Sequence, residues 1–371
     1  MSTIDPTVEA TDLLGAGADG QVLLDEVDVL LEDVLAELRG ILLEVGETPE
    51  DADGPVHVDL VGELADRARH HGKRLRPRLA RWGWTAAGGG DATRARLVDV
   101  AAALELLQLF ALVQDDVMDR SDSRRGRPTL HVVTAARHRR AAALGDADLF
   151  GDSIAVLVAD LALSEATLLA SRGHPRVART WRVMATELVQ GQVLDLTHTA
   201  GRGRDLATSR RIARLKSGRY TVARPLQLGA EVAGAAPELV ERLGAWGDLV
   251  GEAFALRDDV LGAFGDPAAT GKPTGDDLRC GKPTALLAWA EQLLPHADRP
   301  LLAACDAGTL DDDGVHRLQA AMEAAGVREL AEDAVADLVD RADEVLDGLA
   351  VDDRSRTALG ALARAVAWRS A

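Results

Sequence analysis

Two pairs of adjacent aspartates in this chain, Asp115–Asp116 and Asp258–Asp259, lie one residue after apolar runs. In such a setting carboxylates bind metals or carry out chemistry. Asp119 follows the first pair at helical spacing, so it shares a helix face with Asp115. Carboxylates crowded beside an apolar wall repel one another and lose hydration. A divalent cation relieves both penalties, and oxygen-only ligands favour Mg²⁺. The sequence therefore predicts two sites for a hard divalent cation.

Basic side chains suited to a diphosphate accompany these aspartates. Of 42 basic residues only four are lysines, each beside Gly or Ser or in a short basic motif: Lys73, Lys216, Lys272 and Lys282. Arginines follow the first lysine and the first aspartate pair: Arg76, Arg124 and Arg125. Guanidinium forks and ammonium point charges together bind diphosphate groups. A P-loop is excluded because Lys272 is followed by Pro273 rather than by Ser or Thr.

Composition narrows the class of protein further. The 371 residues are 47% hydrophobic and 3% aromatic, which favours packed helices over sheets. A net charge of −18 argues against nucleic acid or an anionic membrane surface as a partner. Cys280 and Cys305 are the only cysteines, too few for a disulfide framework or a thiolate metal site. With no basic start or apolar segment in residues 1–20, we expect a cytoplasmic protein.

Helical periodicity runs through almost the whole chain and predicts an all-α protein. The expected helices lie near residues 22–45, 58–86, 93–120, 130–143, 151–171, 175–198, 206–232, 236–263, 283–294, 298–306, 313–325, 327–348 and 354–369. Asp311–Asp313 and Asp352–Asp353 precede such patterns and are typical N-caps. The apolar stretch Leu97–Val113 contains charged residues, so it predicts a buried core helix rather than a membrane span. Residues 1–20 are expected to be a flexible segment and 21–371 a single domain.

Six motifs, taken in order, resemble the trans-isoprenyl diphosphate synthases, the polyprenyl synthetase family, and within it the actinobacterial short-chain geranylgeranyl diphosphate synthases. The motifs are GKRLRP at 72–77, DDVMD at 115–119, RRGRPT at 124–129, GQVLD at 191–195, KSGRYT at 216–221 and DDVLGAFGDPAATGKPTGDDLRCGKPT at 258–284. The resemblance implies a bundle of about 12 helices around a deep central cavity. It also implies head-to-tail prenyl transfer from an allylic diphosphate (dimethylallyl, geranyl or farnesyl) to isopentenyl diphosphate, and a homodimer.

The resemblance implies a role for each motif residue. Three Mg²⁺ ions would be held by Asp115, Asp119 and Asp258, with Asp116 and Asp259 in support. The allylic diphosphate would be bound by Arg124, Lys216 and Lys272, and the isopentenyl diphosphate by Lys73, Arg76 and Arg125. Gln192 and Asp195 would lie near the metal ions and the allylic substrate, and Lys282 would join the substrate-binding set.

Three positions depart from the family pattern, and two others vary within it. Gln108 and Gln114 stand where relatives usually carry His, and Gln108 would contact isopentenyl diphosphate as a neutral donor. Gly262 replaces the last aspartate of the second motif. The single aromatic Phe110, beside the small Ala111, is the expected floor for the growing chain, which favours geranylgeranyl diphosphate as product with farnesyl diphosphate as the alternative.

Two other functions remain open at this point. A terpene cyclase would share the fold and the first aspartate motif, but would not need Lys73, Arg76 and Arg125. A non-catalytic partner subunit would explain Gln108 and Gln114, although the intact acidic and basic motifs argue against it.

Overall fold

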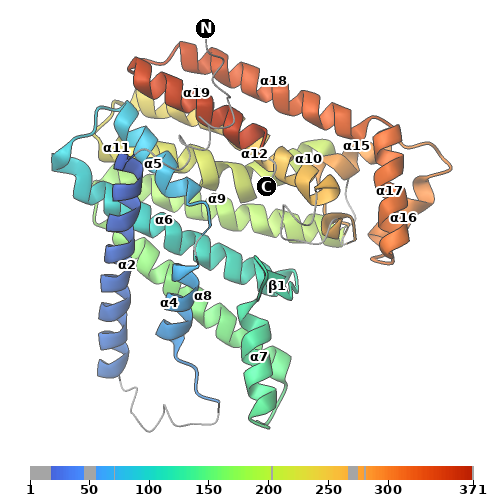
Figure 1. Ribbon diagram of the computed structural model, residues 1–371, viewed down its shortest axis with the longest axis horizontal. Helices are drawn as coiled ribbons and strands as arrows, with labels where there is room; N and C mark the ends of the chain where they lie inside the picture. Colours follow the sequence, from blue (N-terminus) through green and yellow to red (C-terminus); the bar gives the residue numbers. More distant parts are fainter. Residues whose placement is uncertain are drawn as a thin grey trace. The chain divides into compact units, whose positions relative to one another are not determined.

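The computed structural model describes residues 18–45, 56–70, 72–201, 204–265, 275–279 and 281–369, and these are almost entirely helical (Figure 1). The expectation of an all-α fold is confirmed. The chain divides into two compact units. The first comprises Gly17–Arg81 and Gly90–Ala178, and the second comprises Trp82–Gly89 and the described residues from Arg179 onward.

The first unit is built around one long apolar helix, α6 (Asp91–Met118), which α2, α4, α7 and α8 contact. Its other elements are α2 (Ala18–Glu44), α4 (Leu60–Arg69), the start of α5 (Leu75–Ala86), β1 (Ser123–Arg124), β2 (Arg127–Pro128), α7 (Leu130–Arg140) and α8 (Ala147–Ser171). Helix α6 buries every residue from Val100 to Leu104. This confirms the prediction of a core helix over 97–113.

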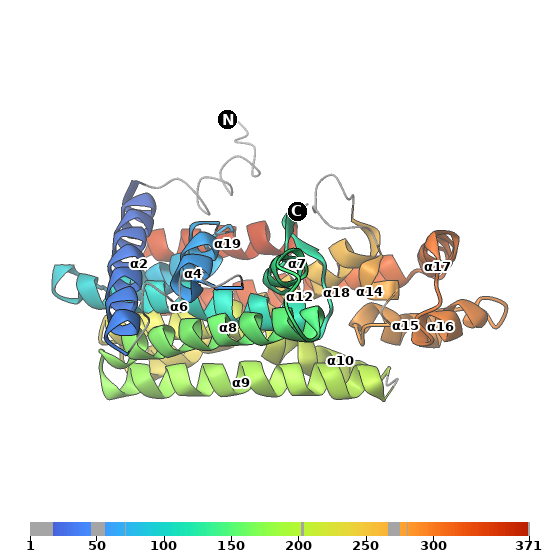
Figure 2. The ribbon, with the colours of Figure 1, turned by 90° about the horizontal axis from the view of Figure 1, so that it is seen from below.

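The second unit is built around α12 (Pro237–Phe264), with α18 (Val327–Asp347) and α19 (Asp353–Ala367) packed against it (Figures 1 and 2). Its other elements are α9 (Pro175–Ala200), which begins in the first unit, α10 (Leu206–Ile212), the π-helix η1 (Ala213–Ala223), α11 (Arg224–Val232), α14 (Asp276–Arg279), α15 (Ala285–Leu293), α16 (Arg299–Asp306) and α17 (Asp312–Ala324).

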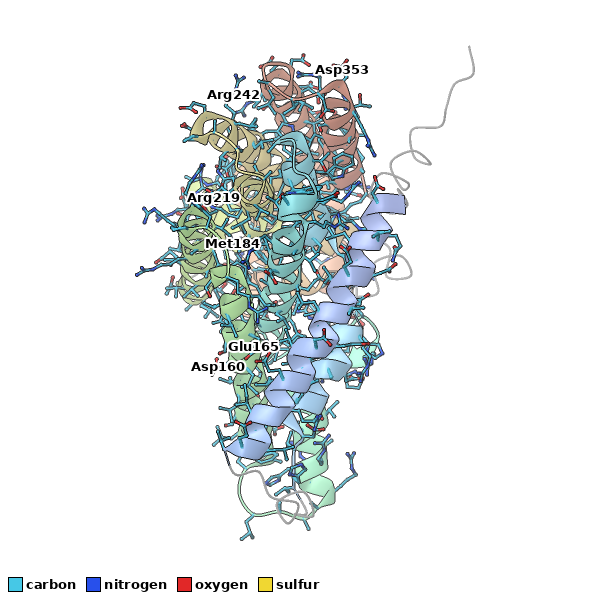
Figure 3. All side chains as sticks on the ribbon, turned by 90° about the vertical axis from the view of Figure 1, so that its left-hand side faces the viewer. Asp160, Glu165, Met184, Arg219, Arg242 and Asp353 are labelled. Atoms are coloured by element: carbon cyan, nitrogen blue, oxygen red, sulfur yellow. The ribbon has the colours of Figure 1, made fainter. Side chains whose placement is uncertain are left out.

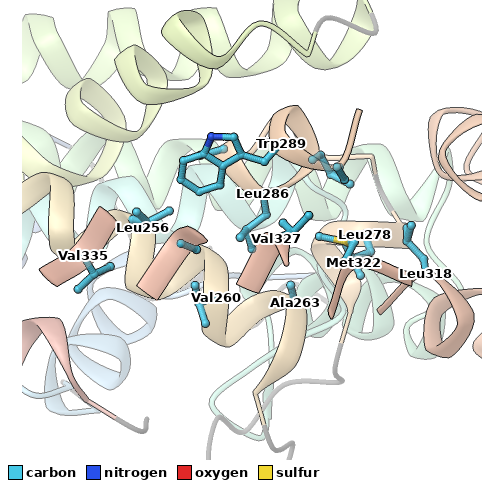
Figure 4. Packing of buried hydrophobic residues seen from close by; sticks show 14 of the residues in the cluster. Leu256, Val260, Ala263, Leu278, Leu286, Trp289, Leu318, Met322, Val327 and Val335 are labelled. Carbon is cyan, nitrogen blue, oxygen red and sulfur yellow. The ribbon is translucent and has the colours of Figure 1, made fainter. Parts of the chain in front are cut away.

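A hydrophobic cluster joins α12 to the helices that follow it in the second unit. Leu256 and Val260 on α12 belong to the same cluster as Leu286 and Trp289 on α15 and Val335 on α18 (Figure 4). Burying side chains of this size stabilises a fold by about 1.5–3 kcal/mol each. The cluster therefore holds the end of α12, where Asp258 and Asp259 lie, against α15 and α18.

Aspartate caps begin several of the helices. Asp311 accepts a hydrogen bond from the amide of Gly314, and Asp352 accepts one from the amide of Ser355, each at 2.8 Å. These contacts confirm that the aspartates before α17 and α19 are N-caps rather than metal ligands.

Helix η1 is the main irregularity of the second unit, and it carries Lys216. Two glycines, Gly218 on η1 and Gly251 on α12, let the two backbones approach so closely that a Cβ on Gly251 would lie 2.7 Å from the carbonyl oxygen of Gly218. Arg219, labelled in Figure 3, ties η1 to both neighbours through Asp248 on α12 (2.7 Å) and Glu187 on α9 (2.6 Å). These contacts fix the position of the wide π turn.

Two helices in the described part of the chain, α6 and α8, are long and apolar enough to cross a membrane by length and composition alone. The most apolar window of α6 is 61% buried and that of α8 is 39% buried. Helices of this length and composition also form the cores of proteins that do not enter membranes.

The sequence pattern predicts one helix over 58–86, whereas the structure contains two, α4 and α5. The described residues between these helices are not helical, and Arg74 among them has a φ of 51°. The short antiparallel pair β1–β2 was not predicted either, because strands of two residues show no alternation in the sequence.

Candidate active site

In the first unit, the first aspartate pair lies in the last turn of α6 and is paired with Arg124 on β1. The Nε of Arg124 donates to Oδ1 of Asp116 at 2.7 Å, and its Nη2 donates to Oδ2 of Asp115 at 3.3 Å. Burial raises the pKa of Asp116, and the neighbouring carboxylate of Asp115 adds to this, whereas Arg124 opposes it. Asp119 follows as the exposed C-cap of α6. The structure thus brings the acidic motif together with Arg124, a residue predicted to bind the allylic diphosphate.

A cluster of arginines lies beside this motif in the first unit. Partial burial of its guanidinium lowers the pKa of Arg125, and repulsion from Arg124 and Arg76 lowers it further, whereas Glu105 raises it. Arg125 also donates to the backbone carbonyl of His70 at 3.2 Å. Its guanidinium occupies the space that a side chain at Gly72 would take. Mutually repelling cations that the fold holds together favour an anion among them.

The GKRLRP motif, whose second half begins α5, is fixed to the first unit by Arg74, whose side chain is only 3% exposed. Arg74 pairs with Asp28 on α2, and its Nε donates to Glu105 on α6 at 3.2 Å. Lys73 and Arg76, on either side of this anchor, are exposed and half-buried respectively. Arg74 therefore fixes the main chain that carries Lys73 and Arg76, two of the residues predicted to bind isopentenyl diphosphate.

The remaining predicted residues of the first unit all lie on α6. Gln108 is half-buried, one turn after Glu105, so these two residues share a helix face. Phe110 is 7% exposed, and Ala111 is half-buried.

In the second unit, carboxylates from three segments gather near the end of α12. Loss of hydration raises the pKa of Asp259 well above its usual range. The carboxylates of Asp277, Asp258 and Asp195 add to this effect, and Lys282 opposes it. The structure thereby brings together the second aspartate pair and two predicted substrate-site residues.

Lys216 is held against Asp195 by the packing of η1 on α9. The Lys216 Nζ donates to Oδ2 of Asp195 at 2.5 Å, and both side chains are largely buried. A Cβ on Gly191 would lie 2.5 Å from the Lys216 amide nitrogen, so only glycine permits this approach of the two helices. Gln192 follows on α9 and is half-buried.

Asp277 on α14 was not anticipated as a site residue. Its Oδ2 would lie 2.5 Å from a Cβ on Gly262, and its Oδ1 pairs with Lys282 at 3.5 Å. The carboxylate of Asp277 therefore occupies the space left by the side chain that Gly262 lacks. The adjacent pair Asp276–Asp277 was visible in the sequence, but nothing local indicated where it folds. Lys272 lies outside the described residues.

Arg369 is a second unanticipated neighbour. Its Nη2 donates to Oδ1 of Asp258 at 2.6 Å. The two residues are 111 positions apart, so no spacing in the sequence could have revealed the contact.

The donor sets in both units fit Mg²⁺. They consist of carboxylate oxygens, which hard cations prefer. The Oδ1 of Asp195 is buried with no hydrogen-bond partner among the described residues. No three acidic, His or Cys side chains in the described ranges are already arranged as a complete ligand set.

Comparison with known proteins places these motifs in a family. Residues 59–322 match the family model described as Polyprenyl synthetase. A geranylfarnesyl diphosphate synthase of Aeropyrum pernix is 32% identical over 301 residues, which are 78% of this chain and 88% of that protein. A (2E,6E)-farnesyl diphosphate synthase of Mycobacterium bovis is 30% identical over 308 residues, 81% of this chain and 80% of that protein.

One solved structure is similar to this chain over nearly the whole length of both. The geranylgeranyl pyrophosphate synthase of Corynebacterium glutamicum, crystallised with isoprenyl diphosphate and magnesium, has a TM-score of 0.81 and 36% sequence identity. The alignment covers 93% of this chain and 99% of that one. The chain therefore belongs to the polyprenyl synthetase family, the trans-isoprenyl diphosphate synthases.

Proposed function

We propose that this enzyme condenses isopentenyl diphosphate with an allylic diphosphate in a Mg²⁺-dependent reaction and that its main product is geranylgeranyl diphosphate. The observation that carries the proposal is the arrangement in the first unit, where Arg76, Arg124 and Arg125 gather beside the DDVMD motif. Cations and carboxylates held side by side suit a ligand that is both an anion and a metal chelator, as a diphosphate is. A terpene cyclase would not need the arginines of the isopentenyl diphosphate site.

Each side chain then has a definite task. Asp115, Asp119 and Asp258 hold Mg²⁺, supported by Asp116 and Asp259. Bound Mg²⁺ neutralises the charge that gathers on the leaving diphosphate. Arg124 and Lys216 bind the allylic diphosphate, with Lys272, Gln192 and Lys282 completing that set. Lys73, Arg76, Arg125 and Gln108 bind isopentenyl diphosphate, and the apolar residues of α6 exclude water from the reacting carbons.

The direct test is an incubation with Mg²⁺, isopentenyl diphosphate and each allylic primer in turn, followed by mass-spectrometric analysis of the chain length. Geranylgeranyl diphosphate as the main product supports the proposal. Farnesyl diphosphate would correct only the chain length, and a cyclised hydrocarbon would instead identify a terpene cyclase.

Replacing either leading aspartate tests the metal sites. Asp115→Ala or Asp258→Ala should lower kcat at least ~100-fold, the scale of losing one strong electrostatic contact in the transition state. Asp337→Ala, which removes an exposed carboxylate on α18, serves as the control and should leave kcat within about twofold. Near-normal turnover in excess chelator would refute the metal requirement.

We also propose a homodimer, as the family resemblance implies. One side of α8 in the first unit exposes Leu149, Val156, Leu157 and Leu168, with Asp160 among them (Figure 3). Apolar residues gathered on one helix side are typical of an interface. Light scattering should give the mass of a dimer for the unaltered protein and that of a monomer for Leu157→Asp. A monomer in both cases would contradict the proposal.

A further inference from the structure

Arg369, which follows α19, is fixed at the second aspartate pair by contacts of both its main chain and its side chain. The Nε of Arg257 donates to the Arg369 carbonyl at 2.9 Å, and Arg257 is itself held by Glu332 on α18 at 2.7 Å. The main chain at Arg369 is therefore attached to the residue that immediately precedes Asp258.

The side chain of Arg369 then lies along one face of α12. Its guanidinium carbon is 4.2 Å from the centre of the Phe254 ring, within the range of a cation–π contact. Phe254 and Asp258 are four residues apart, so they share this face. The guanidinium thus extends from the ring to the carboxylate, where Nη2 meets Oδ1 at 2.6 Å. The Arg369 side chain is 19% exposed, whereas that of Asp258 is 64% exposed.

We propose that Arg369 is the counter-ion of Asp258, and that a divalent cation must compete with its guanidinium for the carboxylate. The inference rests on the proposed role of Asp258 as a metal ligand. The carboxylate of Asp258 repels that of the adjacent Asp259, since it is one of the charges that raise the pKa of Asp259. A fixed guanidinium offsets their repulsion, and it opposes a cation that arrives alone.

The first unit contains the same kind of pairing. There Arg124 donates to Asp115 and Asp116, two residues that stand in the corresponding position of the first motif. In each unit an arginine contacts the leading aspartate of the motif. Arg369 differs because it comes from a segment far along the chain and belongs to none of the family's motifs identified in the sequence.

Removing Arg369 should change metal binding in opposite directions, depending on whether Arg369 is a competing counter-ion or a purely structural contact. If Arg369 only fastened the end of α19, removing it would weaken metal binding or leave it unchanged. If it is a competing counter-ion, removing it should strengthen metal binding. One exposed charge-assisted pair corresponds to about a fivefold change in affinity.

The experiment titrates the full-length protein with Mn²⁺, without substrate, and follows free Mn²⁺ by electron paramagnetic resonance. We expect Arg369→Gln to bind Mn²⁺ about fivefold more tightly than the unaltered protein, and Arg369→Lys to change the affinity less. The matched control is Arg364→Gln on α19, which removes an arginine bound to Asp343 at 2.6 Å and should not change the affinity. In an Asp258→Asn background, Arg369→Gln should have no further effect.

An unchanged or weaker affinity of Arg369→Gln would overturn the inference. Should that variant fail to fold, Phe254→Leu keeps every charge while it removes the ring, and it should also tighten Mn²⁺ binding. In that case, an unchanged or weaker affinity of Phe254→Leu for Mn²⁺ would overturn the inference. The titration requires no turnover, so its failure is distinct from a failure to form prenyl diphosphates.

Discussion

At the scale of single residues, Gln108 is the departure from the family pattern with the clearest kinetic consequence. It shares a face of α6 with Glu105, and Glu105 is bonded to Arg74 of the GKRLRP loop. Gln108 therefore lies beside the group of residues proposed to bind isopentenyl diphosphate. A neutral amide donates a hydrogen bond to a diphosphate without charge, whereas a protonated His would add a charge-assisted bond.

We expect Gln108→His to lower the KM for isopentenyl diphosphate several-fold and to leave the KM for the allylic substrate nearly unchanged. Steady-state kinetics with each substrate varied in turn measures both constants, so the allylic KM serves as the internal control. Equal changes in both constants, or loss of turnover, would show that Gln108 acts elsewhere.

At the scale of elements, α6 carries both the first aspartate motif and the proposed determinant of product length. Phe110 precedes Asp115 by five residues, about 7.5 Å along the helix axis and roughly 140° around it. Phe110→Ala should lengthen the products because it removes a ring from the path of the growing chain, and Ala111→Phe should shorten them. Chromatography of the products measures the distribution, and unchanged lengths in both variants would place the limit on another helix.

The contact between η1 and α12 makes a second prediction at this scale. Gly251→Ala would press a methyl group against the backbone of Gly218, which cannot move aside as a side chain can. We expect a loss of about 1–3 kcal/mol in the free energy of unfolding, measured by urea denaturation. The control is Gly40→Ala on α2, where a Cβ meets nothing within 4 Å, and there we expect a gain of about 0.5–1 kcal/mol. A stabilised Gly251→Ala would contradict the close approach.

At the scale of the whole molecule, aspartate caps make stability depend on pH. Hydrogen bonds from the helix amides lower the pKa values of Asp146 and Asp352, and those from Thr208 lower the pKa of Asp205. Because each pKa is lower in the folded state, the stabilisation is present above the unfolded value of about 4 and disappears as pH falls below it. Asp116 and Asp259, whose pKa values are raised, act in the opposite direction, since their protonation relieves a penalty.

The contribution of the caps should therefore lower the melting temperature below about pH 4, and should do so less in Asp352→Asn, which keeps a capping oxygen without the charge. Differential scanning calorimetry between pH 6 and pH 3 measures both profiles. A melting temperature that held constant or rose below pH 4 would contradict the role assigned to the caps.

The sequence by itself determined the helical class, most helix positions, the N-caps at Asp311 and Asp352, and the order of the family's motifs. These features depend on residues three or four apart, so they are visible in local periodicity. The grouping of 21–371 as one domain, the central cavity and the chemical role of each site residue remain predictions.

Only the tertiary structure decided what surrounds the motif residues. The break at Arg74 depends on partners in α2 and α6, and the close approach at Gly191 depends on the backbone of η1. The carboxylate that fills the space at Gly262 comes from Asp277, and the counter-ion of Asp258 comes from Arg369. Such pairings are set by the packing of segments distant in the chain, and packing leaves no periodic signal in the sequence because either partner alone resembles an ordinary surface charge.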